Sequence, residues 1–389
     1  MKLAILGTRG VPPNYGGFET FAAELSTRLV QRGHEVWVYC RDNPSSAFGT
    51  FSPHEGRRLK PEGARRADEG SSASTWNGVH RIVLPAIGHK YLETVSHAFL
   101  SALDALRRDF DAVLVCNAAN AFVLPLLRAA RIPAAINVDG IERRRRKWNV
   151  LGRAVYSIGE AFSVSFANAV IADAEVIASY YREQYGLAPM TIRYGADFPA
   201  EADSDVLERI GVKAGEYLLY VSRFEPENNP LEVVQAYEKL EGTPPLVMLG
   251  KGLYARELVD ELHRHASNRV LFPGALYGRD YRTLQRNALL YIQATEVGGT
   301  HPALIEAMAS GGAVLAHDTP ENREVGGDAV GYFGLRPAES LSGTIREWLS
   351  NPLKRDDFRT RARKRAEEKF SWERVTDQYE QLFVTISRR

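Results

Sequence analysis

Two stretches of the sequence place a pair of glycines directly before a helix pattern, where a phosphate could bind. The first pair is Gly16 and Gly17 in "YGGFETFAAEL", and the second pair is Gly298 and Gly299 in "EVGGTHPALIEAM". Glycine lets a backbone approach a ligand closely, and the first amides of a helix have no partner within the helix, so they can bind an anion. Either loop alone could be just a long connection. Two of them, one in each half of the chain, predict binding of phosphate groups.

The first glycine-rich loop fits neither of the two common nucleotide-binding motifs. Between the first strand-like run and the first helix pattern, "LGTRGVPPNYGGFET" contains no GxGxxG and is not followed by GK[ST]. It also contains more residues than a connection between a strand and a helix needs. We therefore expect this loop to have a function of its own.

Two charged side chains are placed to complement a nucleotide. Glu306 lies one turn inside the helix pattern that follows Gly298 and Gly299. Its carboxylate oxygens can accept hydrogen bonds from the vicinal hydroxyls of a ribose. Arg223 ends the strand-like run "EYLLYVSR", and its guanidinium offers a planar set of donors that suits a diphosphate. The alternatives are a solvated Glu306 and an Arg223 paired with Glu225 or Glu227.

Strand-like runs alternate with helix patterns in both halves of the chain. The runs are "KLAILG", "EVWVYC", "VHRIVLP", "DAVLVCN", "PAAINV" and "AVIADA", followed by "EYLLYVSR", "PPLVMLG", "NRVLFPG", "LLYIQA", "GAVLAHD" and "AVGYFG". This alternation predicts an α/β fold with mostly parallel sheets. In the first helix pattern Phe21, Leu25 and Leu29 recur at four-residue spacing, and Gly33 is expected to end the helix.

The two series of strands predict two domains. We place them at residues 1–195 and 196–370, joined near "TIRYGADFPAEADSD". The segment 371–389 reads as an amphipathic helix that could pack back on the first domain. Residues 44–75 are polar and rich in glycine, serine and proline, so we predict a mobile loop there.

The bulk composition excludes several classes of protein. The chain has 389 residues, 44% hydrophobic and 25% charged, which is typical of a soluble globular protein. A net charge of +1 argues against a dedicated nucleic-acid binder, and no apolar run approaches the ~18 residues of a membrane-spanning helix. Cys40 and Cys116 each follow a strand-like run and are expected to be reduced thiols of a cytoplasmic protein.

Four motifs together resemble the GT-B glycosyltransferases of the large retaining family four. They are "GTRGVPPNYGGFET", "NVDGIE", "SRFEPENNP" and "GGTHPALIEAMASG", and the first is similar to that of bacterial rhamnosyltransferase-like members. The resemblance covers nearly the whole chain. It implies two Rossmann-like domains facing across a cleft, with a nucleotide-sugar donor on the C-terminal domain and an acceptor on the N-terminal one. It further implies transfer, with retention, of a sugar such as rhamnose to a saccharide or lipid-linked saccharide in cell-surface polysaccharide synthesis.

The resemblance also assigns roles to residues. Arg223 resembles the diphosphate-binding arginine and Glu306 the ribose-binding glutamate, and with His301 they form the implied catalytic set. Leu276 and Tyr277 stand where the family holds the base. The implied donor-binding residues are Gly16, Gly17, Arg223, Asn228, Leu276, Tyr277, Gly298, Gly299, Thr300 and Glu306.

At two positions the sequence departs from the usual family pattern. The family commonly has two glutamates eight positions apart, but the residue eight positions before Glu306 is Gly298, and Glu296 is two positions away from that place. The usual lysine five residues after the arginine is Asn228 here. The contacts to the donor sugar and phosphates are therefore expected to differ from those of common members.

The sequence predicts a reaction without a metal ion or a cofactor. No cluster of His and Cys ligands stands out, which agrees with the resemblance. The charge of the diphosphate would then be met by Arg223, by helix N-termini and by backbone amides.

Several polar residues of the first half are candidates for the acceptor side. For each of them ordinary packing or helix capping is an equally good explanation. These residues are His97, Asn117, Asn120 and Asp139.

The run "ERRRRKW" combines five cations, Arg143 to Lys147, with Trp148. Such a run can be an ordinary solvated surface, or it can dock on an anionic leaflet, where each basic residue contributes on the order of 1 kcal/mol. The second reading predicts a peripheral protein on the inner face of the plasma membrane.

Two alternatives to a glycosyltransferase remain at this stage. A GT-B nucleotide-sugar epimerase or hydrolase would need no lipid acceptor. A non-catalytic nucleotide-sugar-binding protein would explain the absence of the first glutamate and of the lysine.

Overall fold

The computed structural model describes residues 1–13, 17–42, 74–88, 92–141, 150–198, 204–252 and 255–388. Gly16, the basic run Arg143–Lys147 and nearly all of the expected loop 44–75 lie outside these residues. The last two residues of that expected loop belong instead to the short strand β3 (Ser74–Trp76).

The chain divides into two compact units. Unit 1 comprises Met1–Asn137, Gly159–Val170 and Glu380–Arg389, and unit 2 comprises Val138–Ile158 and Ile171–Tyr379.

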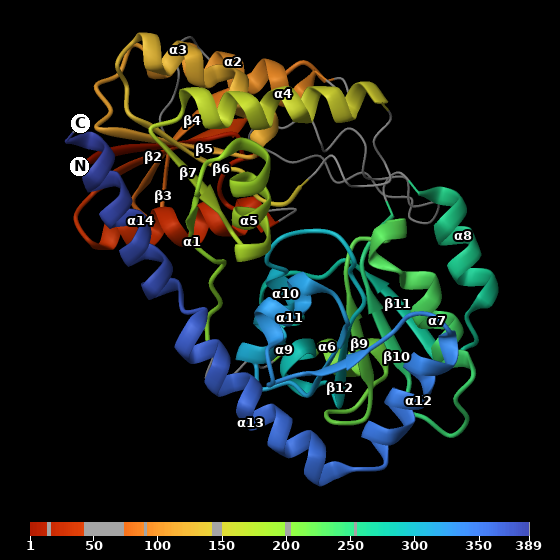
Figure 1. Cartoon of the computed structure of the whole chain (residues 1–389). Coiled ribbons are helices and arrows are strands. Elements are labelled where there is room, and N and C mark those ends of the chain that lie inside the picture. Colours follow the sequence, from red (N-terminus) through yellow and green to blue (C-terminus); the bar gives the residue numbers. More distant parts are fainter. Residues whose placement is uncertain are drawn as a thin grey trace, which may run out of the picture. The chain divides into compact units, whose positions relative to one another are not determined.

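The first sheet has eight strands in the order β3-β4-β2-β1-β5-β6-β7-β8 (Figure 1). Apart from the antiparallel pair β3–β4, the pairs from β4 through β6 and the pair β7–β8 are parallel. The strands besides β3 are β1 (Lys2–Leu6), β2 (Glu35–Arg41), β4 (Val79–Leu84), β5 (Ala112–Cys116), β6 (Ala134–Asn137), β7 (Ala169–Ala172) and β8 (Met190–Thr191).

The helices that follow these strands cover both faces of the sheet. Figure 1 shows α1 on one face, and α2 and α3 on the other. Their bounds are α1 (Gly17–Gln31), α2 (Glu93–Ala105), the 3₁₀ helix η2 (Ala118–Val123), α3 (Leu124–Ala129), α4 (Val150–Phe166) and α5 (Glu175–Tyr185).

Helix α1 confirms the prediction made from its periodicity. Phe21, Leu25 and Leu29 are buried, because residues at four-residue spacing share one helix face. Gly33 follows the helix with a φ of 86°, a left-handed conformation that glycine adopts without strain.

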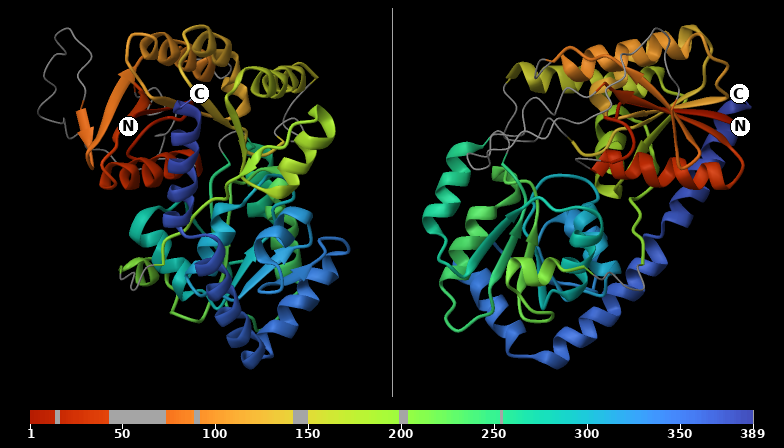
Figure 2. Two further views of the ribbon diagram at one scale, coloured as in Figure 1. Left: turned by 60° about the vertical axis from the view of Figure 1, so that its left-hand side comes forward. Right: turned by 180° about the vertical axis from the view of Figure 1, so that it is seen from behind.

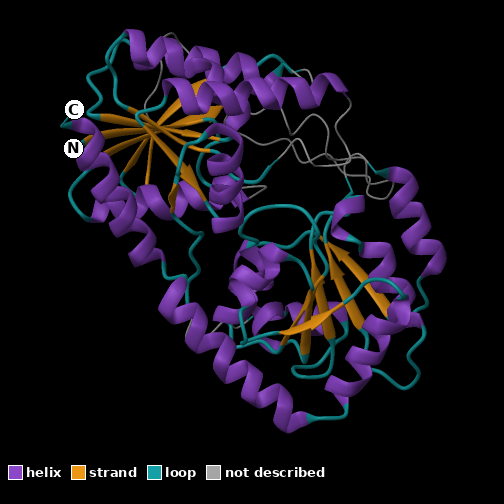
Figure 3. Cartoon of the chain, in the orientation of Figure 1, coloured by secondary structure: helices purple, strands orange, loops and turns teal. Residues whose placement is uncertain are grey.

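The second sheet has six parallel strands in the order β11-β10-β9-β12-β13-β14. Most of their residues are buried, as in a parallel sheet covered by helices on both faces (Figure 3). The strands are β9 (Leu218–Val221), β10 (Leu246–Leu249), β11 (Val270–Gly274), β12 (Leu290–Gln293), β13 (Val314–His317) and β14 (Gly331–Phe333).

Many helices of the second half pack around two of their number, α7 and α10. Helix α7 packs against α8 and α12, and α10 packs against α9, α11 and α13. These helices are labelled in Figure 1, and Figure 2 shows the same ribbon from two further sides. Their bounds are α6 (Val206–Ile210), η4 (Pro226–Asn228), α7 (Pro230–Glu238), α8 (Arg256–His265), α9 (Gly278–Asn287), α10 (Pro302–Ala309), α11 (Pro320–Gly326), α12 (Ala338–Leu349), α13 (Pro352–Lys369) and α14 (Trp372–Ser387).

The end of α14 belongs to unit 1. There the carboxylate of Glu380 accepts a hydrogen bond from Arg32 Nη1 at 2.9 Å and lies 2.7 Å from His34 Nε2. These two hydrogen bonds hold the pKa of Glu380 below its usual value. The end of the helix is thereby fixed to the turn between α1 and β2.

The predicted α/β fold is confirmed, with two parallel-sheet bodies. Both cysteines are buried free thiols, as expected. Two short strands, β3 and β8, were not predicted, because three and two residues carry too little alternation to be recognised. In the described part of the chain, no helix combines the length and the apolar character needed to cross a bilayer.

Candidate functional site

The order of the second sheet defines a point where ligands bind in open α/β folds. If its six strands are numbered 1 to 6 as they follow one another in the chain, their order across the sheet is 3-2-1-4-5-6. The first strand, β9, and the fourth strand, β12, are therefore neighbours. The connections that leave these two strands run to opposite sides of the sheet, which opens a crevice at their carboxyl ends. Arg223 follows β9, and the loop Gly298–Thr300 follows β12. The fold therefore brings two predicted donor loops to one edge.

The loops after β9 and β12 are joined by hydrogen bonds. The Glu296 amide donates to the Glu227 carbonyl at 2.9 Å. The Asn229 side-chain amide donates to the Ala294 carbonyl at 2.8 Å. These bonds fix the relative position of the two loops.

Asn228, at the position of the usual family lysine, is part of this scaffold. Its side-chain amide donates to the Arg223 carbonyl at 2.7 Å, and its own carbonyl accepts from the Tyr220 hydroxyl at 2.8 Å. The residue is only 4% exposed. Asn228 thus fixes the turn that carries Arg223, and its side chain is directed into its own loop.

Arg223 itself is an exposed cation at this edge. Its side chain is 46% exposed, and Nη1 lies 3.5 Å from Glu225 Oε1. One of the two alternatives considered for this arginine, a pair with Glu225, is therefore present. Such an exposed pair contributes at most about 1 kcal/mol, so an anionic ligand can replace it at little cost.

Glu306 is oriented by the neighbouring helix α9. Its Oε2 accepts a hydrogen bond from the Tyr281 hydroxyl at 2.5 Å, and the Gln285 side-chain amide donates to the same hydroxyl at 2.7 Å. Gln285 also donates to the Ala303 carbonyl at 3.2 Å in the first turn of α10. Burial and the carboxylate charge raise the pKa of Tyr281, which keeps its hydroxyl protonated as a donor. The simple solvated glutamate is therefore excluded.

The glycine pair after β12 is required by packing. A Cβ added at Gly298 would lie 2.6 Å from Cε1 of His301, and one added at Gly299 would lie 2.0 Å from Oδ1 of Asp173. The imidazole of His301 thus occupies the space next to position 298. A glutamate there would require this ring to move, which gives a physical reason for the departure from the family pattern.

Asp173 is a residue of this loop cluster that the sequence did not reveal. It follows β7, and its Oδ2 accepts the Thr300 amide at 2.8 Å while its carbonyl accepts the Thr300 hydroxyl at 2.5 Å. The side chain is buried, and its Oδ1 has no hydrogen-bond partner among the residues that the structure describes. Burial first, and then the charge of Asp139, raise the pKa of Asp173 well above its usual value. The Thr300 amide, expected to meet a phosphate, is occupied by this carboxyl group.

Two further donor candidates lie where β11 ends. Leu276 is half-buried, and Tyr277 is 57% exposed immediately before α9. An exposed aromatic ring at the carboxyl edge of a parallel sheet can stack on a planar base.

The long loop after β1 contains glycines that packing requires. Gly7 has a φ of 88°, and a Cβ there would lie 2.5 Å from the Cys116 carbonyl oxygen. Gly10 has a φ of 112°, and its Cβ would lie 2.5 Å from Cys40 Sγ. Gly17 begins helix α1 and is exposed. Of the predicted pair, Gly17 alone falls within the described residues.

Three of the four acceptor-side candidates lie in unit 1. Two of them form hydrogen bonds with the backbone, and the third is buried. Asn117 caps η2 by accepting the Ala119 amide at 2.9 Å. Asn120 donates to the carbonyls of Cys116 and Gly7, at 2.7 and 3.3 Å. His97 is buried, which lowers its pKa to about 4 and leaves its ring neutral at pH 7.

Asp139, the fourth candidate, lies in unit 2 after β6. It has a φ of 55°, a left-handed conformation that asparagine and aspartate adopt more readily than most residues. It faces Asp173 closely enough for its charge to raise the pKa of that residue.

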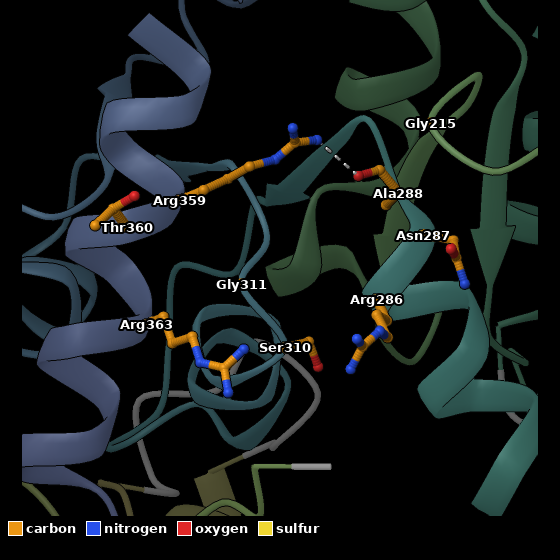
Figure 4. Close-up of a pocket in the computed structure, with 9 residues that line it drawn as sticks. All are labelled: Gly215, Arg286, Asn287, Ala288, Ser310, Gly311, Arg359, Thr360 and Arg363. Carbon is orange, nitrogen blue, oxygen red and sulfur yellow. Dashed lines mark hydrogen bonds between the residues drawn. The ribbon is translucent and has the colours of Figure 1, made fainter. Parts of the chain in front are cut away.

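A cavity of about 440 Å³ lies at the opposite edge of the second sheet (Figure 4). Gly215, Ala288 and Gly311 precede β9, β12 and β13, so this is the amino edge. Figure 4 shows Arg359 donating to the Ala288 carbonyl, at 3.4 Å. None of the predicted donor residues lines this cavity, whose walls are Gly215, Arg286, Asn287, Ala288, Ser310, Gly311, Arg359, Thr360 and Arg363.

Within the ranges that the structure describes, no group of three or more His, Cys, Asp or Glu side chains is arranged to hold a metal ion.

Comparisons with known proteins cover almost all of the chain. Residues 15–196 match the family Glycosyltransferase Family 4, and residues 208–365 match the family Glycosyl transferases group 1. Phosphatidyl-myo-inositol mannosyltransferase of Mycolicibacterium smegmatis is 26% identical over 228 residues, which are 56% of this chain and 57% of that protein. This match therefore spans little more than half the length of the mannosyltransferase. Glycogen synthase of Mycobacterium tuberculosis is 23% identical over 411 aligned residues, 100% of this chain and 95% of that protein.

Solved structures share the fold over nearly the whole chain. Sucrose-phosphate synthase of Thermosynechococcus elongatus has a TM-score of 0.80 at 18% identity, covering 99% of this chain and 98% of that one. Anabaena HepE in complex with UDP and glucose has a TM-score of 0.75 at 15% identity, covering 99% of each chain. The chain therefore has the GT-B fold and is built from a Glycosyltransferase Family 4 domain followed by a Glycosyl transferases group 1 domain.

Proposed function

We propose that this protein is a retaining glycosyltransferase. It moves a sugar, such as rhamnose, from a nucleoside diphosphate to a hydroxyl of a saccharide or lipid-linked saccharide, in the synthesis of a cell-surface polysaccharide. The two family domains support sugar transfer. The mannosyltransferase among the relatives also supports sugar transfer, and the UDP and glucose bound to HepE support a nucleotide sugar as the donor.

The observation that carries this proposal is the position of Arg223 and of the loop before α10 at the carboxyl ends of the neighbouring strands β9 and β12. A cation, a glycine-rich loop and a helix N-terminus meet there, which suits a diphosphate. Glu306 lies one turn further along the same helix, within reach of the nucleoside. We therefore assign the diphosphate to Arg223 and the ribose hydroxyls to Glu306.

The chemistry required of the protein is the stabilisation of a leaving diphosphate. The bond between the anomeric carbon and the diphosphate oxygen breaks, and the acceptor oxygen forms a bond to the same face of the sugar. The proton of the acceptor hydroxyl passes to the departing phosphate oxygen, so no side chain is needed as a base. Arg223 and the first turn of α10, which begins beside His301, stabilise the negative charge that develops on the phosphate.

The position of His301 next to Gly298 assigns it to the sugar end of the donor. In the common family pattern a glutamate occupies position 298, whereas here the imidazole lies against this glycine. A ring in place of a carboxylate offers fewer hydrogen-bond acceptors and more apolar surface. This difference favours a sugar with an apolar substituent, such as a 6-deoxy sugar.

The acceptor is assigned to the N-terminal domain, and the basic run Arg143–Lys147 to the surface of an anionic leaflet. This assignment rests on the sequence, since the run lies outside the described residues. It places the enzyme on the inner face of the plasma membrane, where a lipid-linked saccharide is within reach. Asp139 is the carboxylate to test if a base proves necessary.

The proposal is tested by incubating the purified protein with a panel of nucleotide sugars, with and without lipid-linked acceptors. Release of nucleotide that depends on acceptor is the expected result, and it should persist in EDTA. NMR of the new linkage should show the anomeric configuration of the donor. Release without any acceptor would identify a hydrolase, and binding without release would identify a non-catalytic protein. Either result would overturn the proposal.

A further inference from the structure

Helix α2 exposes large apolar side chains to the solvent along one stripe. Leu92, just before the helix, is 46% exposed, and Val95, Phe99 and Leu103 are 42%, 48% and 36% exposed. Their spacing of three and four residues places them on one face of the helix. We call these four residues the α2 stripe. Ile87, 56% exposed, precedes it in the chain.

The opposite face of α2 already packs in the fold, and apart from His97 it does so with small residues. Ala98, Ser101, Ala102 and Ala105 are buried, and the helix contacts β1, β4 and η2. In a surface helix of a globular protein the large apolar residues normally face the core and polar ones face water. In α2 the small residues face the core and the large apolar residues face outward. The helix therefore carries apolar area that the described fold leaves in water.

Helix α2 itself contains no Lys or Arg, and the cations available to an anionic partner lie in the segments next to it. Both of its carboxylates are paired with arginines. Glu93 accepts from Arg41 Nη1 at 3.0 Å, and Asp104 accepts from Arg108 Nε at 2.6 Å. Exposed cations lie after the end of α2 and at the end of α3, and they outnumber the exposed carboxylates of the same segments by three to two. The cations are Arg107, Arg128 and Arg131, and the carboxylates are Asp109 and Asp111.

A second helix repeats this combination of features. In α4, Val150, Val155 and Ile158 are 83%, 50% and 56% exposed, and Arg153 between them is exposed as well. In the sequence, the basic run Arg143–Lys147 comes shortly before this helix. Apart from these two segments, the large apolar side chains exposed in the described chain are single residues, such as Met190 and Leu353.

We infer that the α2 stripe is a membrane-docking surface, which lies in the boundary between head groups and acyl chains of an anionic bilayer. An apolar helix face flanked by cations is the pattern of helices that lie in this boundary, and nearby arginines contact anionic lipid head groups. Four half-exposed side chains cover far less than the roughly 800 Å² that each partner buries in a standard protein interface. The area thus favours a bilayer over a second copy of the chain. The inference rests on the proposed function and deepens it, because an enzyme docked on a bilayer can take a lipid-linked acceptor directly from that bilayer.

The test compares flotation of the full chain with vesicles of phosphatidylcholine alone and of phosphatidylcholine mixed with phosphatidylglycerol. The wild type should float with the mixed vesicles. The double variant Phe99→Ser/Leu103→Ser should bind them more weakly by on the order of tenfold or more, because it loses two inserting side chains. Val95→Trp should bind more tightly, since tryptophan favours the interface of a membrane. Leu353→Ser removes an apolar side chain that is 83% exposed on α13 and should bind as the wild type does.

Three outcomes would overturn the inference. The first is a double variant that floats as well as the wild type, and the second is a Val95→Trp variant with no gain. The third is a wild type that forms a dimer in light scattering, which the double variant abolishes without any change in flotation. Nucleotide release measured without vesicles should be unchanged in all variants. If the wild type releases no nucleotide but flotation follows the expected pattern, the proposed function fails while the docking surface stands.

Discussion

The hydroxyl of Tyr281 donates a hydrogen bond to Oε2 of Glu306 at 2.5 Å and accepts one from the Gln285 amide at 2.7 Å. Helix α9 thus fixes the orientation of a carboxylate on helix α10. Because a carboxylate that binds two neighbouring hydroxyls must be correctly oriented, this pair of residues links the fold of unit 2 to the proposed binding of ribose.

Replacing Tyr281 by phenylalanine should weaken nucleotide binding with little effect on turnover at saturating donor. The loss of one hydrogen bond to a charged group corresponds to an increase of about tenfold in Kd. Calorimetry with the nucleotide measures this increase. Tyr217→Phe is the matched control, since the Tyr217 hydroxyl also donates to α9, at the Leu284 carbonyl, but does not contact Glu306. Equal affinities for the two variants would contradict the assignment of Glu306.

Replacing Asp173 by asparagine should remove part of the dependence of stability on pH. The pKa of Asp173 is raised by burial and by Asp139, so between about pH 4 and this raised pKa the folded protein holds a proton that the unfolded chain has released. The free energy of unfolding of the wild type therefore falls as pH rises through this window. The Asp173→Asn variant carries no such proton. The Tm of the variant minus the Tm of the wild type should therefore increase as pH rises.

Asp318→Asn is the control for this pH measurement. Hydrogen bonds from Arg323 lower the pKa of Asp318, so its contribution to stability is present above the usual carboxyl pKa and is lost as pH falls. The two variants should therefore differ from the wild type with opposite signs near neutral pH. Parallel Tm profiles for the wild type and Asp173→Asn would show that Asp173 does not titrate in this range.

Gly298→Ala should weaken donor binding by displacing His301. The added Cβ would lie 2.6 Å from Cε1 of the imidazole, so the ring must move. In a His301→Ala background the same substitution should have little effect, because the space is then empty. A double-mutant cycle on the Kd of the donor measures this coupling. If the effects of the two substitutions simply add, position 298 and His301 do not act together.

Glu324 should contribute to stability as a cap for helix α5. Its carboxylate accepts the amides of Glu175 and Val176 at 2.7 and 3.1 Å, and Arg193 Nη2 at 2.9 Å. Replacement by alanine removes these bonds from the helix N-terminus and should cost about 0.5–2 kcal/mol, the usual cost of a lost cap, which is a drop of a few degrees in Tm. Asp328→Ala removes a carboxylate that is 88% exposed and paired with Arg361, and should change the Tm far less. Equal drops for both variants would refute the capping role.

The sequence predicted the elements of the fold well because their signals are local. All the strand-like runs of the second half form strands, since each is a short, buried apolar run between turns. The same local signals placed Arg223 and the loop before α10 at strand ends. Parallel strands then place both at one edge of the sheet without any further information.

The finer parts of the candidate site depend on contacts between distant segments, which no local pattern reveals. Asp173 and Thr300 are 127 residues apart in the sequence, and an aspartate at the end of a strand gives no sign of its partner. Tyr281 reaches Glu306 only because α9 and α10 pack together. The sequence shows that Asn228 stands where the family usually has a lysine. Only the structure shows the hydrogen bond that its side chain donates to the Arg223 carbonyl.

The central claim is that the nucleotide binds at the carboxyl edge of the second sheet, where it contacts Arg223. Arg223 and Arg363 form a matched pair of arginines. Their side chains are 46% and 48% exposed, each is paired with one glutamate, and Arg363 lines the cavity at the amino edge. The most direct measurement is the Kd of the nucleotide and the kcat of sugar transfer for Arg223→Ala and Arg363→Ala. Arg223→Ala should raise Kd on the order of tenfold and lower kcat on the order of a hundredfold, while Arg363→Ala should match the wild type. Normal binding and turnover by Arg223→Ala, with a loss in Arg363→Ala, would place the nucleotide at the other edge and contradict the account.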